Sequence, residues 1–539
     1  MKHVFRSLAT VLGSFLGLAY SAQAQGSYVD DALLYSRQGP AGTARVLGLG
    51  GANVSLGSDF SNLSSNPAGL GFFTKSEVSF TPGVGFGSAS SAPIANAANT
   101  GNLAALNQTA NSFHVASLGV VFANRRPDTD NSSDWRGGSF ALGFTRLADF
   151  NQALSYKNQT DEQHSFMQYL REPGGYSDYT SAGYQNAVQD IANQFNSGSY
   201  TDIDGLAAAG SLTSTNTIKN PADPTHPFYQ VVTPVRTGPV TQREQVLSKG
   251  SLSQFDLGYG ANYRDKLYIG GGIGIVSMNR TRTSTFSEST NGGEDFNFVE
   301  TLKTTGTGIN ARLGLIYRVV DAVRLGASVQ TPTYIHLTDT YGTTLTSQYS
   351  PPNQPNVFST SIPGYDYSIT TPFRANGGVT VLLSKYGFLT GDVEYLNYSA
   401  SHFNTTDGST DPYLDNSNAV IASGYRSVVN LRVGAEGRLD IFRVRAGYAR
   451  YASPYAGTAS YNRDQNYFTG GLGIRSKSFF VDVAGVYLAY KDRYSPYTLV
   501  SNEVVQPTPA PATPVVRAAP VIASDYSRFT VSVTGGLTF

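Results

Sequence analysis

Residues 529–539, at the C-terminal end, alternate strictly between apolar and polar side chains. One face carries Phe529, Val531, Val533, Leu537 and Phe539, and the other carries threonine, serine and glycine. A period of two predicts a β-strand with one apolar and one polar face. The polar face of a soluble sandwich would be rich in charge, whereas small hydroxyls and glycines suit a crowded polar lumen with the apolar face turned to lipid.

The same alternation occurs upstream with charged residues on the polar face. In residues 429–436 and 442–448, valine, leucine and alanine alternate with Arg432, Arg443 and Arg445. An arginine turned to lipid at mid-bilayer costs about 2–4 kcal/mol. We therefore expect these arginines to point into the lumen.

Composition agrees with this assignment and excludes several classes of protein. Charged residues make up 14% of the 539 residues, against about a quarter in soluble domains, while aromatic residues reach 12%. The formal net charge is zero, which gives no basic field for a nucleic-acid partner. With no cysteine in the chain, disulfide scaffolds and thiolate metal sites are excluded.

The alternation predicts fourteen strands, and the links between them differ in length. The strand centres lie near Phe80, Leu118, Leu142, Leu257, Ile273, Ala311, Leu325, Val379, Val393, Val433, Val444, Gly471, Val483 and Val533. Short turns at 264–266, 320–321, 384–386, 439–440 and 476–477 alternate with long links. The fold class expected is all-β, a transmembrane antiparallel barrel with short periplasmic turns and long outer loops. The long link 124–136, on the short-turn side, departs from this scheme.

Four long outer loops are expected, at 88–110, 151–249, 345–365 and 491–525. Within 151–249, residues 161–170 and 181–195 have helical spacing. These helices either offer an apolar groove at the barrel mouth or pack on each other. Residues 507–520 form a Pro-rich strip inside the last loop.

The N-terminus has the pattern of an export signal. Lys2 and Arg6 precede an apolar stretch over residues 8–20, and Ala22-Gln23-Ala24 supplies a peptidase cleavage site. Residues 1–24 are therefore expected to be a signal peptide, and the apolar stretch 8–20 is too short to span a bilayer as a helix.

The segment between this signal and the first strand resembles a known family. It contains Thr43-Ala-Arg-Val-Leu-Gly-Leu-Gly-Gly-Ala-Asn53 and Asp59-Phe-Ser-Asn-Leu-Ser-Ser-Asn-Pro-Ala-Gly-Leu-Gly-Phe-Phe73. This resembles the start of the FadL-type outer-membrane transporters of long-chain fatty acids and aromatic hydrocarbons, and Arg146-Leu-Ala-Asp-Phe-Asn151 also resembles that family. The resemblance implies an N-terminal hatch over 25–75 that plugs a barrel of residues 76–539. Its motif would comprise Asn66, Pro67 and Ala68 with Gly48, Gly50 and Gly51.

The glycines of this motif have a physical role in a plug, and two other interpretations of the segment are considered. Gly48, Gly50 and Gly51 let the backbone turn and pack closely, and Pro67 restricts Asn66 to extended conformations. A phosphate-binding loop would need a preceding strand and a third glycine, which are missing here. The segment could also be a structural plug that touches no ligand.

The resemblance implies passive uptake of hydrophobic compounds across the outer membrane of a Gram-negative bacterium, without a cofactor or catalytic group. The captured compound would be held behind the hatch and released through a gap in the wall near the third strand. Implied partners are hydrophobic small molecules, outer-membrane lipid and lipopolysaccharide, and the barrel assembly machinery, which would recognise Phe539. The protein is expected to be a monomer. Ligand-binding candidates are Phe72, Phe73, Arg312, Arg324, Arg432, Arg443 and Arg445. Each arginine could instead be paired with an inward acid such as Asp392, Glu394 or Glu436.

Other functions have weaker support in the sequence. The histidines are scattered without metal-ligand spacing, and only His114 lies centrally in a predicted strand, which argues against a hydrolase. Residues 128–134 have acidic spacing but lack the glycine and final glutamate of a calcium loop. The open alternative to transport is an outer-membrane docking component of a secretion or surface-attachment system, which would use the long loops.

Overall fold

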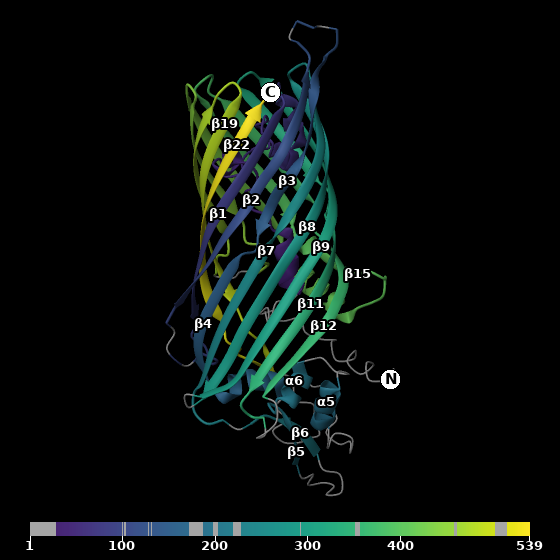
Figure 1. The fold of residues 1–539 in the computed structure, drawn as a ribbon, viewed down its shortest axis with the longest axis vertical. Coiled ribbons are helices and arrows are strands. Elements are labelled where there is room, and N and C mark those ends of the chain that lie inside the picture. Colours follow the sequence, from purple (N-terminus) through teal and green to yellow (C-terminus); the bar gives the residue numbers. More distant parts are fainter. Residues whose placement is uncertain are drawn as a thin grey trace.

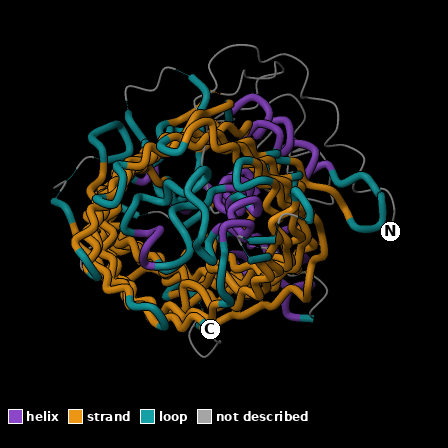
Figure 2. The backbone as a smooth tube through the Cα atoms, turned by 90° about the horizontal axis from the view of Figure 1, so that it is seen from above, coloured by secondary structure: helices purple, strands orange, loops and turns teal. Residues whose placement is uncertain are grey.

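Fourteen antiparallel strands close into a barrel in the computed structural model (Figures 1 and 2). The structure describes residues 28–539 apart from 100, 102–103, 128, 131, 172–186, 198–202, 219–227, 235, 291–292, 351–355, 458–460 and 502–514. The signal peptide expected at 1–24 lies outside the described residues, as do positions 128 and 131 of the acidic stretch.

The first strand of the barrel closes the ring. β1 (Glu77–Pro93) pairs with β2 (Leu106–Arg125) on one side and with β22 (Ile522–Thr538) on the other. The other wall strands follow in chain order: β3 (Trp135–Asp149), β7 (Val240–Tyr263), β8 (Leu267–Thr290), β9 (Gly293–Val320), β10 (Val323–Gln330), β13 (Arg374–Leu382), β14 (Gly387–Asn397), β16 (Ser427–Leu439), β17 (Phe442–Tyr451), β18 (Gln465–Arg475) and β19 (Phe479–Tyr494). Every predicted strand centre lies in a different wall strand, so the predicted fold class is confirmed.

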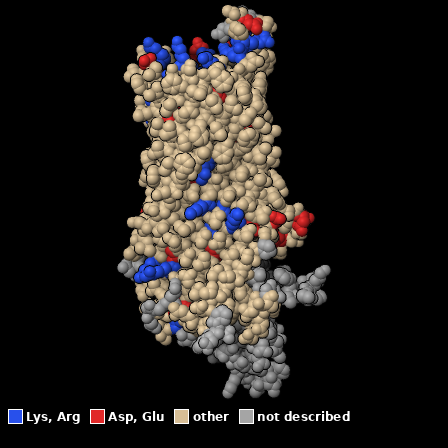
Figure 3. Space-filling model, viewed as in Figure 1, with Lys and Arg blue, Asp and Glu red and all other residues tan. Residues whose placement is uncertain are grey.

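The two faces of the wall are oriented as the alternation predicts. On β22, Ser532 and Thr534 are buried, whereas Val533 and Leu537 are 39% and 59% exposed on the outside. Figure 3 shows the outer wall as a broad band with few charged side chains, while lysine and arginine gather at the short-turn end. The outward apolar band is the surface that a bilayer would cover.

The predicted short turns all lie at one end of the barrel, the end that carries the C-terminus in Figure 1. Arg264, Asp265, Ser384 and Asp440 adopt positive φ angles of 52° to 56° in these turns. The long link after β2 lies at the same end, between Arg125 and Trp135.

At the other end, strands extend into the ranges expected to be loops. β11 (Tyr334–Ser347) and β12 (Val357–Thr370) form a hairpin that extends the wall next to β9, and β4 (Gln152–Thr160) pairs with β7. β15 (His402–Thr405) pairs with β12. Strands therefore occupy both ends of the ranges 88–110 and 345–365, which were expected to be loops. These strand ends are rich in serine and threonine on both faces, so they lack the alternation that marks a wall strand inside a membrane.

The remaining elements lie in the links between wall strands on the loop side of the barrel. They are η3 (Glu162–His164), α4 (Phe166–Arg171), α5 (Ala187–Asn196), α6 (Ile203–Ala209), β5 (Ser214–Ile218), β6 (Phe228–Val232), η5 (Tyr398–Ala400), α7 (Pro412–Gly424), β20 (Leu499–Ser501) and β21 (Val515–Arg517). α4 and α5 correspond to the two predicted helical pieces, although residues 181–186 lie outside the described part. No helix in the described part of the chain is long and apolar enough to cross a bilayer.

The helices of the largest loop pack on the barrel rim and on each other. Phe166 and Met167 of α4 are buried in one cluster with Leu206 of α6 and with Phe286 and Phe296 of the wall. α5 contacts α6 through Ala192 and Ala208. Packing, rather than an open apolar groove, therefore accounts for these side chains.

The N-terminal segment lies inside the barrel. Its elements are α1 (Tyr28–Ser36), α2 (Ala44–Leu47), α3 (Asn62–Ser65) and η2 (Pro67–Phe72), and Figure 2 shows helices within the ring of strands. α2 contacts β18, β19 and β22, while η2 contacts β7, β8 and β9 on the opposite wall. Residues 43–73 therefore reach across the lumen near its short-turn end.

Candidate functional site

Glycines line the inner wall where residues 48–71 lie against it. A Cβ atom added to Gly314 of β9 would lie 1.8 Å from Asn66 Oδ1, and one added to Gly270 of β8 would lie 2.4 Å from the carbonyl carbon of Pro67. The same close approach occurs at Gly119, Gly143, Gly258, Gly260, Gly326, Gly378, Gly434 and Gly447. The wall therefore forms a close-fitting seat for the backbone of the N-terminal segment.

Asn66, the first residue of the Asn-Pro-Ala motif, fixes this segment to the wall. Its Nδ2 donates to the carbonyl oxygens of Val54 at 2.7 Å, Leu315 at 3.2 Å and Ala327 at 3.2 Å. Its Oδ1 accepts from the Ala68 backbone N–H at 3.1 Å, which caps η2. Asn66 is fully buried, so the side chain connects two parts of the segment to β9 and β10.

The Gly-rich turn occupies the opposite side of the seat. Gly50 and Gly51 adopt φ angles of +67° and +81°, which favour glycine. A Cβ on Gly50 would lie 3.1 Å from the Tyr448 backbone, and one on Gly48 would lie 3.4 Å from Gly471 Cα. The expected roles in turning and close packing match this placement.

Three of the five candidate arginines have acidic neighbours in the wall. Arg312 lies 2.9 Å from Asp256, Arg445 lies 2.8 Å from Glu436 and 2.6 Å from Asp482, and Arg432 lies 4.0 Å from Asp392. Asp392 accepts from the Asn53 and Val54 backbone N–H groups, and Arg45 lies 3.7 Å from Glu436. These charges connect wall strands and hold the N-terminal segment.

The other two arginines and the two phenylalanines also contact protein groups. Arg324 donates to the Leu56 carbonyl at 2.7 Å and lies over the Phe72 ring, with its guanidinium carbon 4.5 Å from the ring centroid. Phe72 stacks on Tyr268 with ring centroids 3.6 Å apart, and Phe73 is buried in a cluster with Phe60. Arg443 donates to carbonyls of its own turn. None of the residues of the predicted hatch motif and none of the predicted ligand-binding residues lines the cavity described next.

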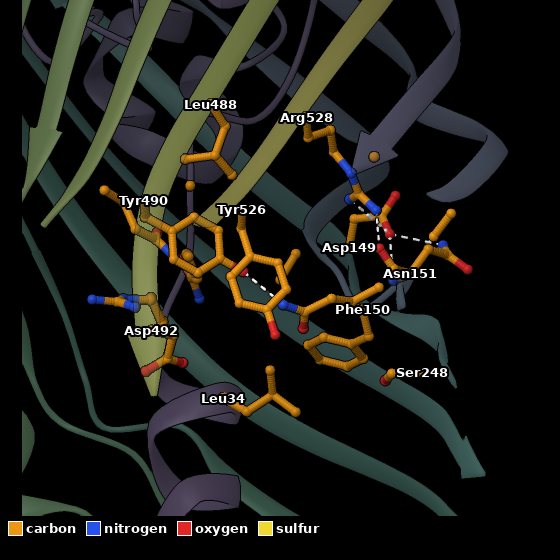
Figure 4. A pocket seen from close by; sticks show the side chains of 18 of the residues that line it. Leu34, Asp149, Phe150, Asn151, Ser248, Leu488, Tyr490, Asp492, Tyr526 and Arg528 are labelled. Carbon is orange, nitrogen blue, oxygen red and sulfur yellow. Dashed lines mark hydrogen bonds and ion pairs between the residues drawn. The ribbon is translucent and has the colours of Figure 1, made fainter. Parts of the chain in front are cut away.

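A cavity of about 440 Å³ lies between the N-terminal segment and the wall (Figure 4). Its lining comes from α1 and the residues after it, from Phe150 and Asn151, which join β3 to β4, and from strands β1, β2, β3, β4, β7, β8, β18, β19 and β22. Figure 4 shows Leu34, Phe150 and Leu488 beside Tyr490 and Tyr526. These two tyrosines stack with centroids 4.9 Å apart, and the Tyr490 hydroxyl accepts from Gln152 Nε2 at 2.9 Å. The cavity thus combines aliphatic and aromatic surface with polar groups.

The link between β3 and β4 bends into the lumen and is held by charge. Asp149 accepts from the backbone and side-chain N–H groups of Asn151, and it pairs with Arg528 at 3.0 Å and Arg146 at 3.3 Å. Arg528 also donates to the Asn151 carbonyl. Phe150 is 4% exposed and joins the cluster inside the lumen.

Two glycines give the Arg528 side chain its route from β22 past β1. A Cβ on Gly87 would lie 3.6 Å from Arg528 Nε, and one on Gly85 would lie 3.9 Å from Arg528 Cδ. Because these positions carry no side chain, the guanidinium can lie over β1 and reach the bend.

The wall is interrupted beside the bend. β2 pairs with β3 only from Ser117 to Arg125, and its residues 106–116 pair with β1 alone. A second hollow, of about 480 Å³, lies at this interruption and is lined by residues that include Ser112, Phe113 and Arg146, the last shared with the first cavity. The cavity and the outer surface therefore approach each other at the place where the backbone ladder is absent.

The cavity contains more basic than acidic groups. Its lining includes the arginines 37, 146, 280, 282, 463, 493 and 528 with Lys491, against the aspartates 30, 31, 149 and 492. Asp31, Asp149 and Asp492 each pair with one or two of these arginines. Nε and Nη2 of Arg37 are buried without a hydrogen-bond partner in the described part of the chain. The excess of positive charge favours an anionic group in the cavity.

The sequence pointed to part of this site. The run Arg146–Asn151 was noted for its resemblance and His114 for its place in a strand, and both line the cavity. Arg528 was missed although it directly precedes the alternating residues 529–539, and extending that alternation by one residue puts it on the inward face. Tyr490 and Tyr526 were missed because they border a range assigned to a loop.

Comparisons with known proteins support the fold. No family model matches the chain, and no curated protein matches it in sequence. A Pseudomonas aeruginosa FadL homologue of known structure superposes with a TM-score of 0.50 and 12% identity over 92% of this chain and 98% of that chain. The P. putida toluene transporter TodX gives a TM-score of 0.49 and 12% identity over 93% of this chain and 99% of that chain. In fold, the chain is therefore similar to FadL-type barrels.

Proposed function

We propose that this protein is an outer-membrane channel for passive uptake of hydrophobic compounds with an acidic group, such as long-chain fatty acids. The observation that carries the proposal is the cavity, which lies between a filled lumen and an interrupted wall. The outward apolar band and the likeness in fold to a FadL homologue support the location and the class of channel.

In the proposed path, the compound enters from the loop end and is held in the cavity. Residues 43–73 close the short-turn end, because their seat leaves no room between glycine and backbone. The compound then leaves sideways, past Phe150 and Ser112, through the interruption beside β3. No step requires a cofactor or a covalent intermediate.

The charge of the cavity favours an acid over a neutral hydrocarbon. An ionised carboxylate would accept hydrogen bonds from Arg37, whose buried Nε and Nη2 have no partner in the described residues. Its apolar chain would lie against Leu34, Leu488 and the stacked tyrosines. Hydrogen bonds with a charged partner contribute about 1.5–3 kcal/mol each, so acid and hydrocarbon should differ measurably in affinity.

The proposal is tested by uptake of a fluorescent fatty acid into liposomes that contain the purified protein. Leu488→Trp places bulk in the cavity, and the neighbouring Tyr487→Trp, on the exposed outer face, is its matched control. Ser112→Trp in the wall interruption has Leu118→Trp, on the exposed outer face of the same strand, as its control. We expect both inward variants to lose uptake and both outward variants to retain it.

Uptake by the wild type that equals the background of empty liposomes would contradict transport. A protein partner that co-purifies through the long loops would then favour the docking role.

A further inference from the structure

Four basic side chains stand on the outer face of the wall at the loop end. Lys157 of β4, Arg243 and Lys249 of β7, and Lys303 of β9 are all exposed. Figure 3 shows blue side chains on this face, below the broad band that is almost free of charge. In the described part of the chain, none of the four forms an ion pair with an aspartate or glutamate.

The pairing of strands shows where these residues lie relative to the apolar band. Phe255, Ile275 and Ile309 lie directly opposite one another on β7, β8 and β9, and they are 42% to 55% exposed. On the same outward face of β7, β8 and β9, the next two rows toward the loop end consist of serine, threonine and asparagine. The next row is Lys249, Thr281 and Lys303, again directly opposite one another.

The spacing of the rows matches an interface between lipid tails and head groups. Six residues of a strand span about 20 Å, and a strand tilt of about 40° makes this about 15 Å along the membrane normal. Lys249 and Lys303, two strands apart, are separated by about 10 Å with a hydroxyl between them. Lys249 and Thr281 also border the outer hollow at the wall interruption.

The second basic pair lies farther out and is unfavourable on its own. Lys157 is directly opposite Arg243 in the β4–β7 ladder. Like charges directly opposite each other on neighbouring strands destabilise a sheet. An anionic group between the two side chains would turn this repulsion into attraction, and the exposed face leaves that place to a group from outside the protein.

We propose that Lys157, Arg243, Lys249 and Lys303 form a binding surface for the phosphate groups of a lipid head group in the outward-facing leaflet. The inference rests on the proposed outer-membrane location, because only there does a phosphorylated glycolipid surround the wall at this height. The two basic levels suit a head group that extends along the wall and carries more than one phosphate. The lysine row would place such a lipid at the rim of the wall interruption.

The experiment measures binding of lipid A that carries both phosphates to the full-length protein in mixed micelles. The variants are Lys249→Gln with Lys303→Gln, and Lys157→Gln with Arg243→Gln. The control, Lys266→Gln with Lys385→Gln, removes two exposed lysines from turns at the opposite end. Each basic residue near a membrane surface contributes about 1 kcal/mol, so each pair of substitutions should weaken binding about 30-fold. The control should bind like the wild type.

Equal binding by the wild type and both variants would overturn the inference, as would equal binding of lipid A stripped of its phosphates. Inorganic phosphate that binds as tightly as the lipid would overturn the assignment to a lipid head group. Cell fractionation separates this test from that of the proposed function. A protein outside the outer membrane contradicts the function, whereas an outer-membrane protein with unchanged lipid A binding contradicts only this surface.

Discussion

Glycine lines the wall near the short-turn end of the lumen, and arginine gathers in the cavity nearer the loop end. Against β8, β9 and β10, Asn66 and Pro67 approach the wall so closely that a single added carbon atom would collide. Beside β2 and β3, the ladder stops, the chain bends inward and a cavity of about 440 Å³ remains. The first region is a closed seat and the second an open compartment, although both belong to one barrel.

Charge differs between the two regions in the same way. At the seat, Arg445 lies between Glu436 and Asp482, and all three are buried. At the cavity, arginines outnumber aspartates. Matched buried charges hold a structure together, whereas unmatched ones attract a ligand. Substitutions at the seat should therefore affect stability, and substitutions at the cavity should affect binding and uptake.

The largest expected effect is at the seat. Arg445→Met leaves Glu436 and Asp482 without their shared partner, and breaking a buried pair costs about 3–5 kcal/mol. We expect the free energy of unfolding, measured by urea titration in lipid vesicles, to fall by this amount. Arg443→Met is the control, because the hydrogen bonds of Arg443 to the described residues go to carbonyls of its own turn. Equal losses in both variants would contradict the distinction between paired and unpaired arginines.

The next effect is displacement of the N-terminal segment. Gly314→Ala puts a carbon atom 1.8 Å from Asn66 Oδ1, and overpacking of this kind costs about 1–3 kcal/mol. Because the chain has no cysteine, a single cysteine in place of Ser64 reports the change through its rate of maleimide labelling. We expect faster labelling in Gly314→Ala and no change in Gly535→Ala, where nothing lies within 4 Å of the added atom.

A smaller effect on stability is expected at the bend. Asp149→Asn keeps an acceptor for Asn151 but removes the charge that attracts Arg146 and Arg528. Since these side chains are 16–17% exposed and therefore better solvated than the buried triad at the seat, we expect a smaller loss of stability than for Arg445→Met, together with reduced fatty-acid uptake. Asp525→Asn, which affects an exposed pair with Lys491, is the control. A large loss of stability without a change in uptake would show that the bend, like the seat, serves stability rather than uptake.

Replacing Arg37 should have the smallest effect on stability and should change which ligands the cavity binds. Arg37→Gln removes a cation whose Nε and Nη2 have no partner in the described part of the chain. We expect stability to be unchanged and the affinity for an ionised fatty acid to fall about tenfold, as measured by calorimetry in detergent. Binding of a neutral aromatic hydrocarbon should not change. A similar fall for both ligands would show that Arg37 shapes the cavity rather than binding an anion.

The sequence predicted the wall better than the site, for a physical reason. Val533 faces outward and Thr534 faces the lumen, so their alternation marks the strand. The hairpin of β11 and β12 lies beyond the apolar band. Threonine and serine are frequent there, and the apolar Ile335 and Leu337 are buried on the inner face instead of standing on the outer one. The cavity draws on Leu34, Asp149, Leu488 and Arg528, which are far apart in the chain and meet only after the barrel closes. The run Arg146–Asn151 and His114 were the local signs of it in the sequence.

The most direct test of the account is a crystal structure of the protein with a fatty acid that carries a terminal bromine atom. The anomalous signal of bromine locates the apolar end of the chain independently of the rest of the density. The account predicts one strong bromine peak inside the cavity, near Leu488 and the stacked Tyr490 and Tyr526, with the carboxylate toward Arg37. Bromine found only on the outer wall or among the helices of the large loop, with an empty cavity, would contradict it.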